Sequence, residues 1–261
     1  MILELTFELS GTKQILPLNY QYALGSWIYR VISQGDKEYA ERLHKEGYRI
    51  ENGKIFKLFV FSNLRFPDRT SKLIPKSDRL EIRSREAKLD IGFYVPELMS
   101  NFVKGLFENL ELEIGDRISV VSMKVKYVEV QNPFLPENGP YRLRALTPII
   151  MGFKREGVRN EVYELPDVAD YGEKFLQNLA FKYEAATGKK VELEKMQFRL
   201  LTENPRSKKI TIKDHTPERT EIRGYLYEFE IDAPKEIVEL GLTAGFGREN
   251  SWGMGWCELV K

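Results

Sequence analysis

Side chains that could carry acid–base chemistry near neutral pH are few in this sequence. It contains two histidines, His44 and His215, and one cysteine, Cys257. Asp36 and Gly47 are placed to begin and end a helix, and His44 would lie in its last turn, where the helix dipole favours a protonated imidazole. This histidine could transfer protons in catalysis, or it could be an inert surface residue at a helix end. His215 lies in a polar turn, and we assign it no catalytic role.

Two further side chains stand out from the pattern around them. Tyr29 lies on an expected helix, beside its apolar stripe rather than on it. The stripe consists of Leu24, Trp27, Ile28, Val31 and Ile32. Lys57 interrupts the apolar run from Phe56 to Phe61, and strand alternation would place it on one face with Phe59 and Phe61. A lysine among aromatic residues must either extend to water or meet an anion. Each residue alone fits a structural role as well as a functional one.

Two Gly-x-Gly pairs flank a short polar turn near the C-terminus. The glycines are Gly245, Gly247, Gly253 and Gly255, and the polar residues between them include Arg248, Asn250 and Ser251. Glycine adopts backbone conformations that other residues avoid, and it lets a second backbone approach closely. Such a loop could present N–H donors to a chain of phosphates, or it could merely turn the chain. A dinucleotide-binding fingerprint is excluded because Asn250 stands where its third glycine is required.

Basic residues also gather shortly before these glycines. Between Arg206 and Arg223 the chain has six basic residues and three acidic ones. The lysines of this segment are Lys208, Lys209 and Lys213. Basic residues on strands can follow a phosphate backbone, or they can form the solvated face of an antiparallel sheet.

Composition narrows the classes of protein that remain. The 261 residues are 42% hydrophobic, which is enough for one large domain or two of ordinary size. No apolar run approaches the length of a membrane span, and no signal peptide is recognisable. The single cysteine favours a reducing cytoplasm, and with two histidines it leaves no cluster for zinc. We therefore expect no membrane, no metal and no cofactor. A nuclease of this composition would use metal-independent chemistry, in which an RNA 2′-hydroxyl is the nucleophile.

The order of expected elements predicts an α+β protein with a repeated architecture. The first half has strands over 2–9, 55–61, 80–83, 87–93 and 118–130, with two helices between 19 and 47 and a third over 96–110. After a proline-rich linker, the second half has strands over 141–153, 191–201, 209–213, 221–231 and 254–260, with helices over 171–186 and 234–240. This order predicts two tandem ferredoxin-like (βαββαβ) domains, residues 1–131 and 132–261, with the glycine-rich loop near the C-terminus.

Several segments together match a known family pattern over nearly the whole chain. They are residues 17–22, Ile28-Tyr29, Leu43-His44, residues 56–62, Arg223-Gly224-Tyr225, Phe229-Glu230 and the loop Gly245–Gly255. With the tandem βαββαβ order, they resemble the CRISPR-associated endoribonucleases that cut repeat RNA into guide RNAs. These enzymes belong to the repeat-associated RNA-binding superfamily.

The resemblance implies a set of catalytic roles. His44 would be the general acid–base residue, Tyr29 would orient the nucleophile, and Lys57 would stabilise charge on the transition state, with Lys54 as its nearest rival. The 2′-oxygen would attack the adjacent phosphorus. The products would carry a 2′,3′-cyclic phosphate and a 5′-hydroxyl, and no metal would take part.

The resemblance also implies the partners. CRISPR repeat RNA would lie between the two sheets and the loop. Its expected contacts are Lys208, Lys209, Lys213, Gly245, Gly247, Arg248, Asn250, Ser251, Gly253 and Gly255. Other subunits of a CRISPR effector complex, or a second copy of this chain, are further candidate partners. Two alternatives stay open: a non-catalytic RNA-binding subunit of an effector complex, and a ferredoxin-like module with no RNA role.

Overall fold

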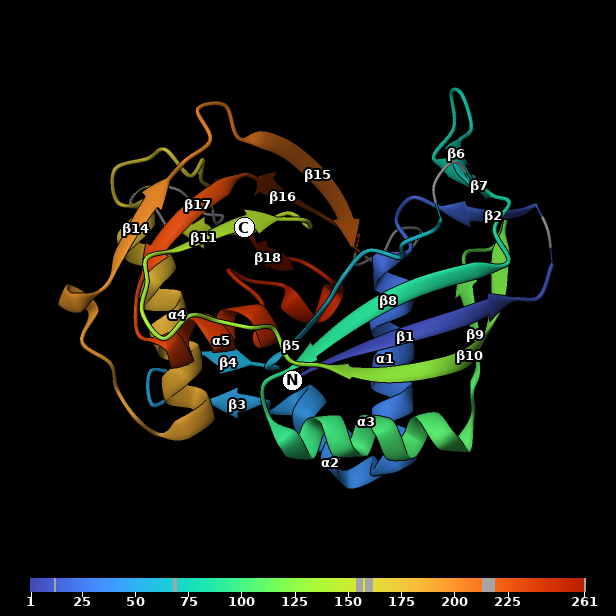
Figure 1. Ribbon diagram of the computed structural model, residues 1–261, viewed down its shortest axis with the longest axis horizontal. Coiled ribbons are helices and arrows are strands. Elements are labelled where there is room, and N and C mark those ends of the chain that lie inside the picture. Colours follow the sequence, from blue (N-terminus) through green and yellow to red (C-terminus); the bar gives the residue numbers. More distant parts are fainter. Residues whose placement is uncertain (12, 68–69, 154–156, 158–161, 213–218, 261) are drawn as a thin grey trace.

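The computed structural model describes the chain apart from residues 12, 68–69, 154–156, 158–161, 213–218 and 261. The described strands and helices form two α+β units, one from each half of the chain (Figure 1). No helix in the described part of the chain is long and apolar enough to cross a membrane.

The N-terminal unit is built on a five-stranded antiparallel sheet. Its strands are β1 (Ile2–Leu9), β5 (Phe59–Phe61), β8 (Glu86–Phe93), β9 (Glu111–Gly115) and β10 (Val120–Gln131). They lie in the order β5-β8-β1-β10-β9, so that β1 pairs with both β8 and β10. Alternate side chains of β1, including Leu3, Leu5 and Phe7, are buried in the core of this unit. Without the edge strand β9, this is the strand order of a ferredoxin-like unit.

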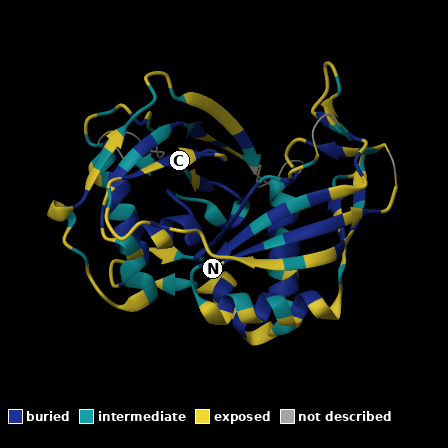
Figure 2. Cartoon of the chain, in the orientation of Figure 1, coloured by how far each residue is buried: buried dark blue, intermediate teal, exposed yellow. Residues whose placement is uncertain are grey.

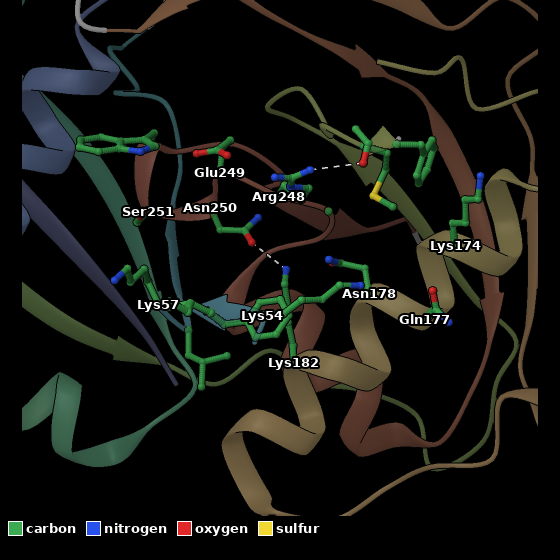
Figure 3. A pocket seen from close by; sticks show the side chains of 18 of the residues that line it. Lys54, Lys57, Lys174, Gln177, Asn178, Lys182, Arg248, Glu249, Asn250 and Ser251 are labelled. Carbon is green, nitrogen blue, oxygen red and sulfur yellow. Dashed lines mark hydrogen bonds between the residues drawn. The ribbon is translucent and has the colours of Figure 1, made fainter. Parts of the chain in front are cut away.

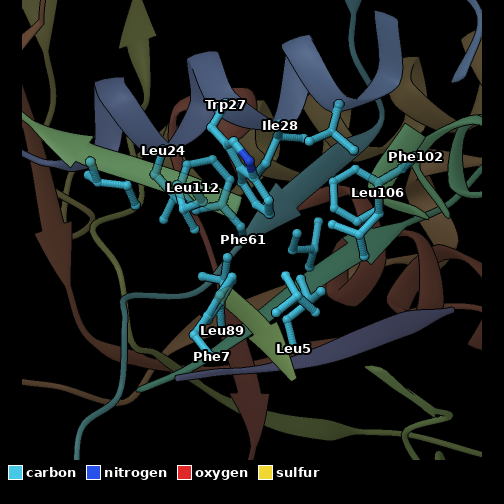
Figure 4. Packing of buried hydrophobic residues seen from close by; sticks show 14 of the residues in the cluster. Leu5, Phe7, Leu24, Trp27, Ile28, Phe61, Leu89, Phe102, Leu106 and Leu112 are labelled. Carbon is cyan, nitrogen blue, oxygen red and sulfur yellow. The ribbon is translucent and has the colours of Figure 1, made fainter. Parts of the chain in front are cut away.

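Three helices pack in the same unit: α1 (Gln21–Gly35), α2 (Lys37–Lys45) and α3 (Pro96–Glu108). The predicted apolar stripe of α1 is confirmed, since all of its members are buried. Figure 4 shows Trp27 and Ile28 of this stripe above the core side chains of the sheet. The Trp27 ring meets Phe7 and Phe102 edge-on, with ring centroids 6.0 and 5.8 Å away. The buried stripe therefore fixes which face of α1 is turned away from the core. Tyr29 lies at the border between that face and the stripe, and it is partly buried.

Helices α1 and α3 approach closely because each carries a glycine where they cross. A Cβ atom on Gly105 would lie 1.8 Å from the carbonyl oxygen of Val31. A Cβ atom on Gly35 would lie 1.9 Å from the carbonyl oxygen of Asn101. Only a residue without a side chain fits at either position, so these two glycines set the distance between the helices.

The C-terminal unit repeats the arrangement with a four-stranded antiparallel sheet. Its strands are β11 (Tyr141–Ala145), β14 (Gln197–Leu200), β17 (Glu228–Asp232) and β18 (Cys257–Leu259), and its helices are α4 (Tyr171–Thr187) and α5 (Lys235–Ala244). The order β14-β17-β11-β18 corresponds to β5-β8-β1-β10 of the first unit. Its core contains a group of aromatic rings from Phe175, Phe229 and Phe246, with centroids 5.3–5.9 Å apart. The predicted fold class, two tandem ferredoxin-like units with a C-terminal glycine-rich loop, is confirmed.

Short strands are inserted between these main elements. They are β2 (Gln14–Pro17), β6 (Ser71–Leu73) and β7 (Arg79–Ile82) in one small sheet, and the pairs β3 (Tyr48–Arg49) with β4 (Ile55–Phe56), β12 (Gly152–Phe153) with β13 (Val162–Tyr163), and β15 (Arg206–Ile212) with β16 (Thr220–Leu226). Two short 3₁₀ helices, η1 (Leu193–Lys195) and η2 (Asn250–Trp252), complete the described chain. Sequence reasoning did not predict β2, β3, β6, β9 or β13. All but β9 are at most four residues long. The β9 strand alternates between exposed and buried residues, but it directly follows the helix expected over 96–110.

The expected continuous strand over residues 55–61 is wrong. The structure divides it into β4 and β5, because Leu58 between them has a φ of +55°. Leu58 is buried in the C-terminal core, whereas Phe59 is buried in the N-terminal core. The chain thus passes from one unit to the other at this point, and Lys57 does not share a strand face with Phe59 and Phe61.

The two units are joined by buried contacts as well as by the chain. Ile2 and Val60 of the first unit form one buried cluster with Trp256 of the second. A Cβ atom on Gly92 would lie 2.7 Å from the carbonyl oxygen of Thr243, so β8 and α5 touch through their backbones. Buried residues, dark blue in Figure 2, accordingly continue through the middle of the molecule. We propose that the units divide between residues 131 and 132, after β10 ends.

We predict that Gly105→Ala destabilises the protein by about 1–3 kcal/mol, because the added methyl group would overlap the Val31 carbonyl and force α1 and α3 apart. Urea unfolding measures the change. The control is Ser100→Ala at an exposed position of the same helix, which should change stability by less than about 0.5 kcal/mol. Equal effects of the two substitutions would contradict the tight crossing.

Candidate active site

A cavity of about 720 Å³ opens between the two units. Its N-terminal walls come from α1, the end of α2 and the segment 54–58. Its C-terminal walls come from α4, the segment 151–153 and the glycine-rich loop (Figure 3). The cavity brings together all three residues predicted to be catalytic, Tyr29, His44 and Lys57, with the middle of the predicted RNA-binding loop. This size is within the usual range for ligand pockets.

His44 and Tyr29 reach the cavity from two different helices. The α2 helix begins at the predicted cap, where the Asp36 carboxylate accepts the Tyr39 amide at 2.9 Å. It ends before Gly47, whose φ is +57°. This leaves His44 exposed in the last turn of α2, with its ring 5.6 Å from that of Tyr29, centroid to centroid, at an interplanar angle of 77°. The two side chains are neighbours although 15 positions separate them in the sequence.

Tyr29 itself is held by aromatic neighbours from both units. Its ring lies 5.4 Å from Phe59 of β5 and 6.4 Å from Trp252 of the loop, measured between centroids. Burial raises the pKa of the Tyr29 phenol to about 12, while a hydrogen bond with the Ser251 side chain opposes the rise and Glu249 adds to it. The phenol is therefore neutral near pH 7 and can donate a hydrogen bond.

Lys57 is attached to the same turn of α2. Its Nζ donates to the carbonyl oxygens of Leu43 and His44, at 2.5 and 2.7 Å. These carbonyls are among the unpaired acceptors at the end of the helix, so the lysine caps α2 and holds the backbone of the histidine. Burial lowers the pKa of Lys57. An ammonium group has three donors, so one remains for another acceptor.

Lys54, the rival lysine, comes from the same segment, but its side chain extends to α4 in the C-terminal wall. Its Nζ is 4.0 Å from the ring centroid of Phe181 on α4. Burial lowers the pKa of Lys54, and the charge of Arg248 lowers it further. Both lysines therefore line the cavity, but of the two only Lys57 donates a hydrogen bond to the backbone carbonyl of His44.

The glycine-rich loop docks on the N-terminal unit. The Trp252 ring stacks on Tyr22 of α1, with centroids 4.7 Å apart and an interplanar angle of 17°. A Cβ atom on Gly25 of α1 would lie 2.7 Å from the Ser251 carbonyl oxygen. Gly253 has a φ of +78°, and a Cβ atom there would lie 2.6 Å from the Phe61 ring. Small residues on both sides thus allow the contact that carries Ser251 to Tyr29.

Most amides of this loop already have partners inside the protein. The amides that donate to backbone carbonyls are those of Gly245, Phe246, Arg248, Trp252, Gly253, Met254 and Gly255. The Asn250 side chain also turns inward, because its Nδ2 donates to the carbonyls of Phe246 and Met254 at 3.1 and 2.8 Å. At these positions the loop does not offer a row of exposed N–H donors. The RNA-binding roles of its residues stay predictions.

The remaining predicted RNA contacts lie elsewhere. Lys208 and Lys209 are exposed on β15, and Lys209 forms an ion pair with Glu221 at 2.6 Å. They line a smaller hollow of about 20 Å³ with Gly253 and Met254, apart from the cavity that contains His44. Lys213 lies outside the described residues, as does His215.

Positive charge dominates the lining of the larger cavity. Its basic members are His44, Lys54, Lys57, Lys174, Lys182 and Arg248. Glu249 is the one acidic residue among the described lining residues. In the described part of the chain, no three His, Cys, Asp or Glu side chains gather closely enough to hold a metal ion. The chemistry that this lining can support directly is proton transfer and the binding of an anion.

Two family models match the chain. The model described as CRISPR-associated protein Cas6, N-terminal, matches residues 15–126, and the model described as CRISPR associated protein Cas6, C-terminal, matches residues 131–259. The chain belongs to the Cas6 family. The two matched regions contain all of the described residues that line the cavity.

Relatives of this Cas6 family member are similar along nearly their entire length. A protein of Methanocaldococcus jannaschii named CRISPR-associated endoribonuclease Cas6 1 is 28% identical over 255 residues, which are 95% of this chain and 88% of the relative. A solved structure described as CRISPR associated protein Cas6 has a TM-score of 0.74 and 28% identity, covering 100% of this chain and 99% of the other. Another, described as an RAMP protein binding different RNA substrates, has a TM-score of 0.80 and 20% identity, covers both chains completely, and shows the same fold.

Sequence reasoning missed Lys182, which joins the glycine-rich loop to α4. Its side chain is buried, with 2% of the residue exposed. Its Nζ donates to the Gly245 carbonyl at 2.5 Å and to Asn250 Oδ1 at 2.7 Å (Figure 3). Burial lowers the pKa of Lys182 to about 7, and the nearby Cys257 opposes this shift only in part. The only signal in the sequence is a lysine near the apolar side of a predicted helix, which also describes many surface lysines.

We predict that Lys182→Met removes a pH dependence of stability. The folded pKa of Lys182, about 7, lies below its ordinary value of 10.5. The unfolded chain therefore binds more protons between these two pH values, and wild-type stability rises with pH across this range. The gain from this group between pH 7 and pH 9 should be about 2 kcal/mol, and the variant should lack it.

Urea unfolding of both proteins at pH 7, 8 and 9 measures this difference. The variant should also lose some stability at every pH, because Asn250 Oδ1 and the Gly245 carbonyl lose their donor. Parallel pH profiles of wild type and variant would contradict the buried, desolvated state of the ammonium group.

Proposed function

We propose that this protein is an endoribonuclease that cleaves CRISPR repeat RNA without a metal ion. The observation that carries the proposal is the shared cavity in which His44, Tyr29 and Lys57 meet the glycine-rich loop. Its basic lining suits a ligand with several negative charges. The Methanocaldococcus jannaschii relative is named as an endoribonuclease and matches 95% of this chain, which supports the same activity here.

In the proposed reaction, the RNA supplies its own nucleophile. The 2′-oxygen next to the cut attacks the adjacent phosphorus, and the bond from phosphorus to the 5′-oxygen breaks. The proton of the 2′-hydroxyl leaves, and the departing 5′-oxygen gains a proton, so the products carry a 2′,3′-cyclic phosphate and a 5′-hydroxyl. His44 exchanges one of these protons, because its exposed ring faces the cavity at the end of α2.

The other two residues act on charge and orientation. The third donor of Lys57 is directed to the phosphate oxygens, whose negative charge grows in the transition state. Its bonds to the Leu43 and His44 carbonyls keep it beside the histidine. Tyr29 stays a neutral phenol because burial raises its pKa to about 12. It therefore orients the reacting hydroxyl as a hydrogen-bond donor, not as a base.

The substrate for this test is RNA of the CRISPR repeat that lies beside the coding region of this protein. We predict that His44→Ala slows its cleavage by about 10²–10⁴-fold, because proton transfer loses its catalyst. Binding of the same RNA should change by less than about threefold, since one exposed ring contributes little area. Cleavage is followed on gels in the presence of EDTA, and binding is followed by filter retention. His215→Ala is the matched control and should cleave like the wild type.

A repeat RNA with a 2′-deoxy nucleotide at the cut should bind and resist cleavage. Cutting of this analogue would exclude attack by the 2′-oxygen. A strict requirement of the wild type for added Mg²⁺ would contradict the metal-independent mechanism. Binding of intact repeat RNA without any scission from pH 5 to pH 9 would favour the alternative, a non-catalytic RNA-binding subunit.

We predict that Lys57→Ala lowers the cleavage rate at saturating RNA more than Lys54→Ala does, by about tenfold or more. Lys57 is bonded to the residue that carries the imidazole, whereas Lys54 lies over Phe181 on α4. Single-turnover rates of both variants on the same repeat RNA measure the difference. A larger loss from Lys54→Ala would assign the catalytic role to Lys54 instead.

A further inference from the structure

One side of α4 faces the cavity with polar side chains that the proposed chemistry does not use. Lys174, Gln177, Asn178 and Lys182 all line the cavity, and their spacing of i, i+3, i+4 and i+8 places them along one face of the helix. Figure 3 shows the four side chains along this side of α4, opposite the loop. Lys182 is bonded to the loop, and Lys174 pairs with Asp170 at 2.6 Å. In the described part of the chain, neither Gln177 nor Asn178 makes a side-chain hydrogen bond that holds the fold.

Asn178 has a polar atom that the protein leaves unpaired. Its Oδ1 is buried and has no hydrogen-bond partner among the described residues. A buried acceptor without a partner is unfavourable, and such groups are rare in folded proteins. The terminal torsion of asparagine is roughly two-fold, so a half-turn exchanges its oxygen and nitrogen and can turn either atom to the cavity. A ligand that offers a donor beside an acceptor would satisfy the amide.

Aromatic rings and cations complete this part of the cavity. Phe56 and Phe153 line it together with the two amides. Lys174 Nζ lies 4.3 Å from the Phe153 ring centroid, and Lys54 Nζ lies near α4 over Phe181. Unstacked RNA bases are bound by aromatic faces and by side chains that hydrogen-bond to their polar edges. The volume of about 720 Å³ also exceeds what one phosphate group requires.

We propose that Asn178, with Gln177 beside it, binds the polar edge of an unstacked adenine in the repeat RNA close to the cut. This subsite rests on the proposed function, because the same cavity holds His44. We choose adenine and its N6/N7 edge because only adenine offers a donor beside an acceptor on that edge, where guanine offers two acceptors; an amide can bind the adenine edge with two hydrogen bonds. The subsite would give the enzyme a base preference that neither the catalytic residues nor the backbone contacts supply.

Single-nucleotide variants of the CRISPR repeat RNA, covering every position with each base, test the subsite. Cleavage efficiency (kcat/KM) is measured for wild type, Asn178→Ala and Asn178→Asp, with Gln34→Ala at an exposed position of α1 as the control. At one position near the cut, the wild type and the control should prefer adenine by about tenfold. Asn178→Ala should lose this preference while still cleaving. Asn178→Asp should lose it as well, because a carboxylate only accepts hydrogen bonds and cannot donate to the adenine N7.

Affinities of the same variants, made uncleavable by a 2′-deoxy nucleotide, separate this subsite from the proposed reaction. If the wild type does not cleave but binds adenine preferentially through Asn178, the proposed function fails and the base subsite stands. If the wild type cleaves and the Asn178 variants keep its base preferences, the subsite is overturned and the endoribonuclease stands. A wild type without any preference at a nucleotide near the cut would also overturn it.

Discussion

A cavity lined by two folding units exists only while those units stay docked. Here the docking runs through the glycine-rich loop, whose Trp252 stacks on Tyr22 and whose Ser251 carbonyl packs against Gly25. The same contact brings the Ser251 side chain to the phenol of Tyr29. Because α1 carries both Tyr22 and Gly25 one to two turns before Tyr29, a single helix presents the docking surface and a candidate catalytic side chain together.

Burial also determines the electrostatics of the cavity. Lys54, Lys57 and Lys182 lie partly or wholly out of water, which lowers the pKa of each. Desolvated ammonium groups without matching carboxylates are unfavourable on their own and become favourable when an anion enters. Glu249 alone cannot neutralise this set. The folded protein therefore holds in place charges that an anion would stabilise, which supports the proposed binding of RNA in this cavity.

What the sequence could predict depended on local chain geometry. The stripe of α1, the Asp36 cap and the end of α2 at Gly47 all follow from nearby residues, so the position of His44 on its helix was predictable. Its nearness to Tyr29 needed the family pattern, because tertiary packing brings the two together. The break at Leu58 was missed since a positive φ at a leucine has no local signal. The roles of Lys182 and Asn178 could not be predicted, because they depend on the cavity that both residues line and not on their neighbours in the sequence.

Asn250 illustrates why residue type does not settle which partner a polar side chain meets. Its amide donates to two loop carbonyls and accepts from Lys182, so its hydrogen-bonding groups are used within the protein. Asn178, of the same type, lines the same cavity, and its Oδ1 has no hydrogen-bond partner among the described residues. The first amide shapes the loop by satisfying its carbonyls, whereas the second is the residue on which the proposed base subsite depends. Recognition by this loop and helix would thus depend on side chains, because most loop amides are already used to hold its turns.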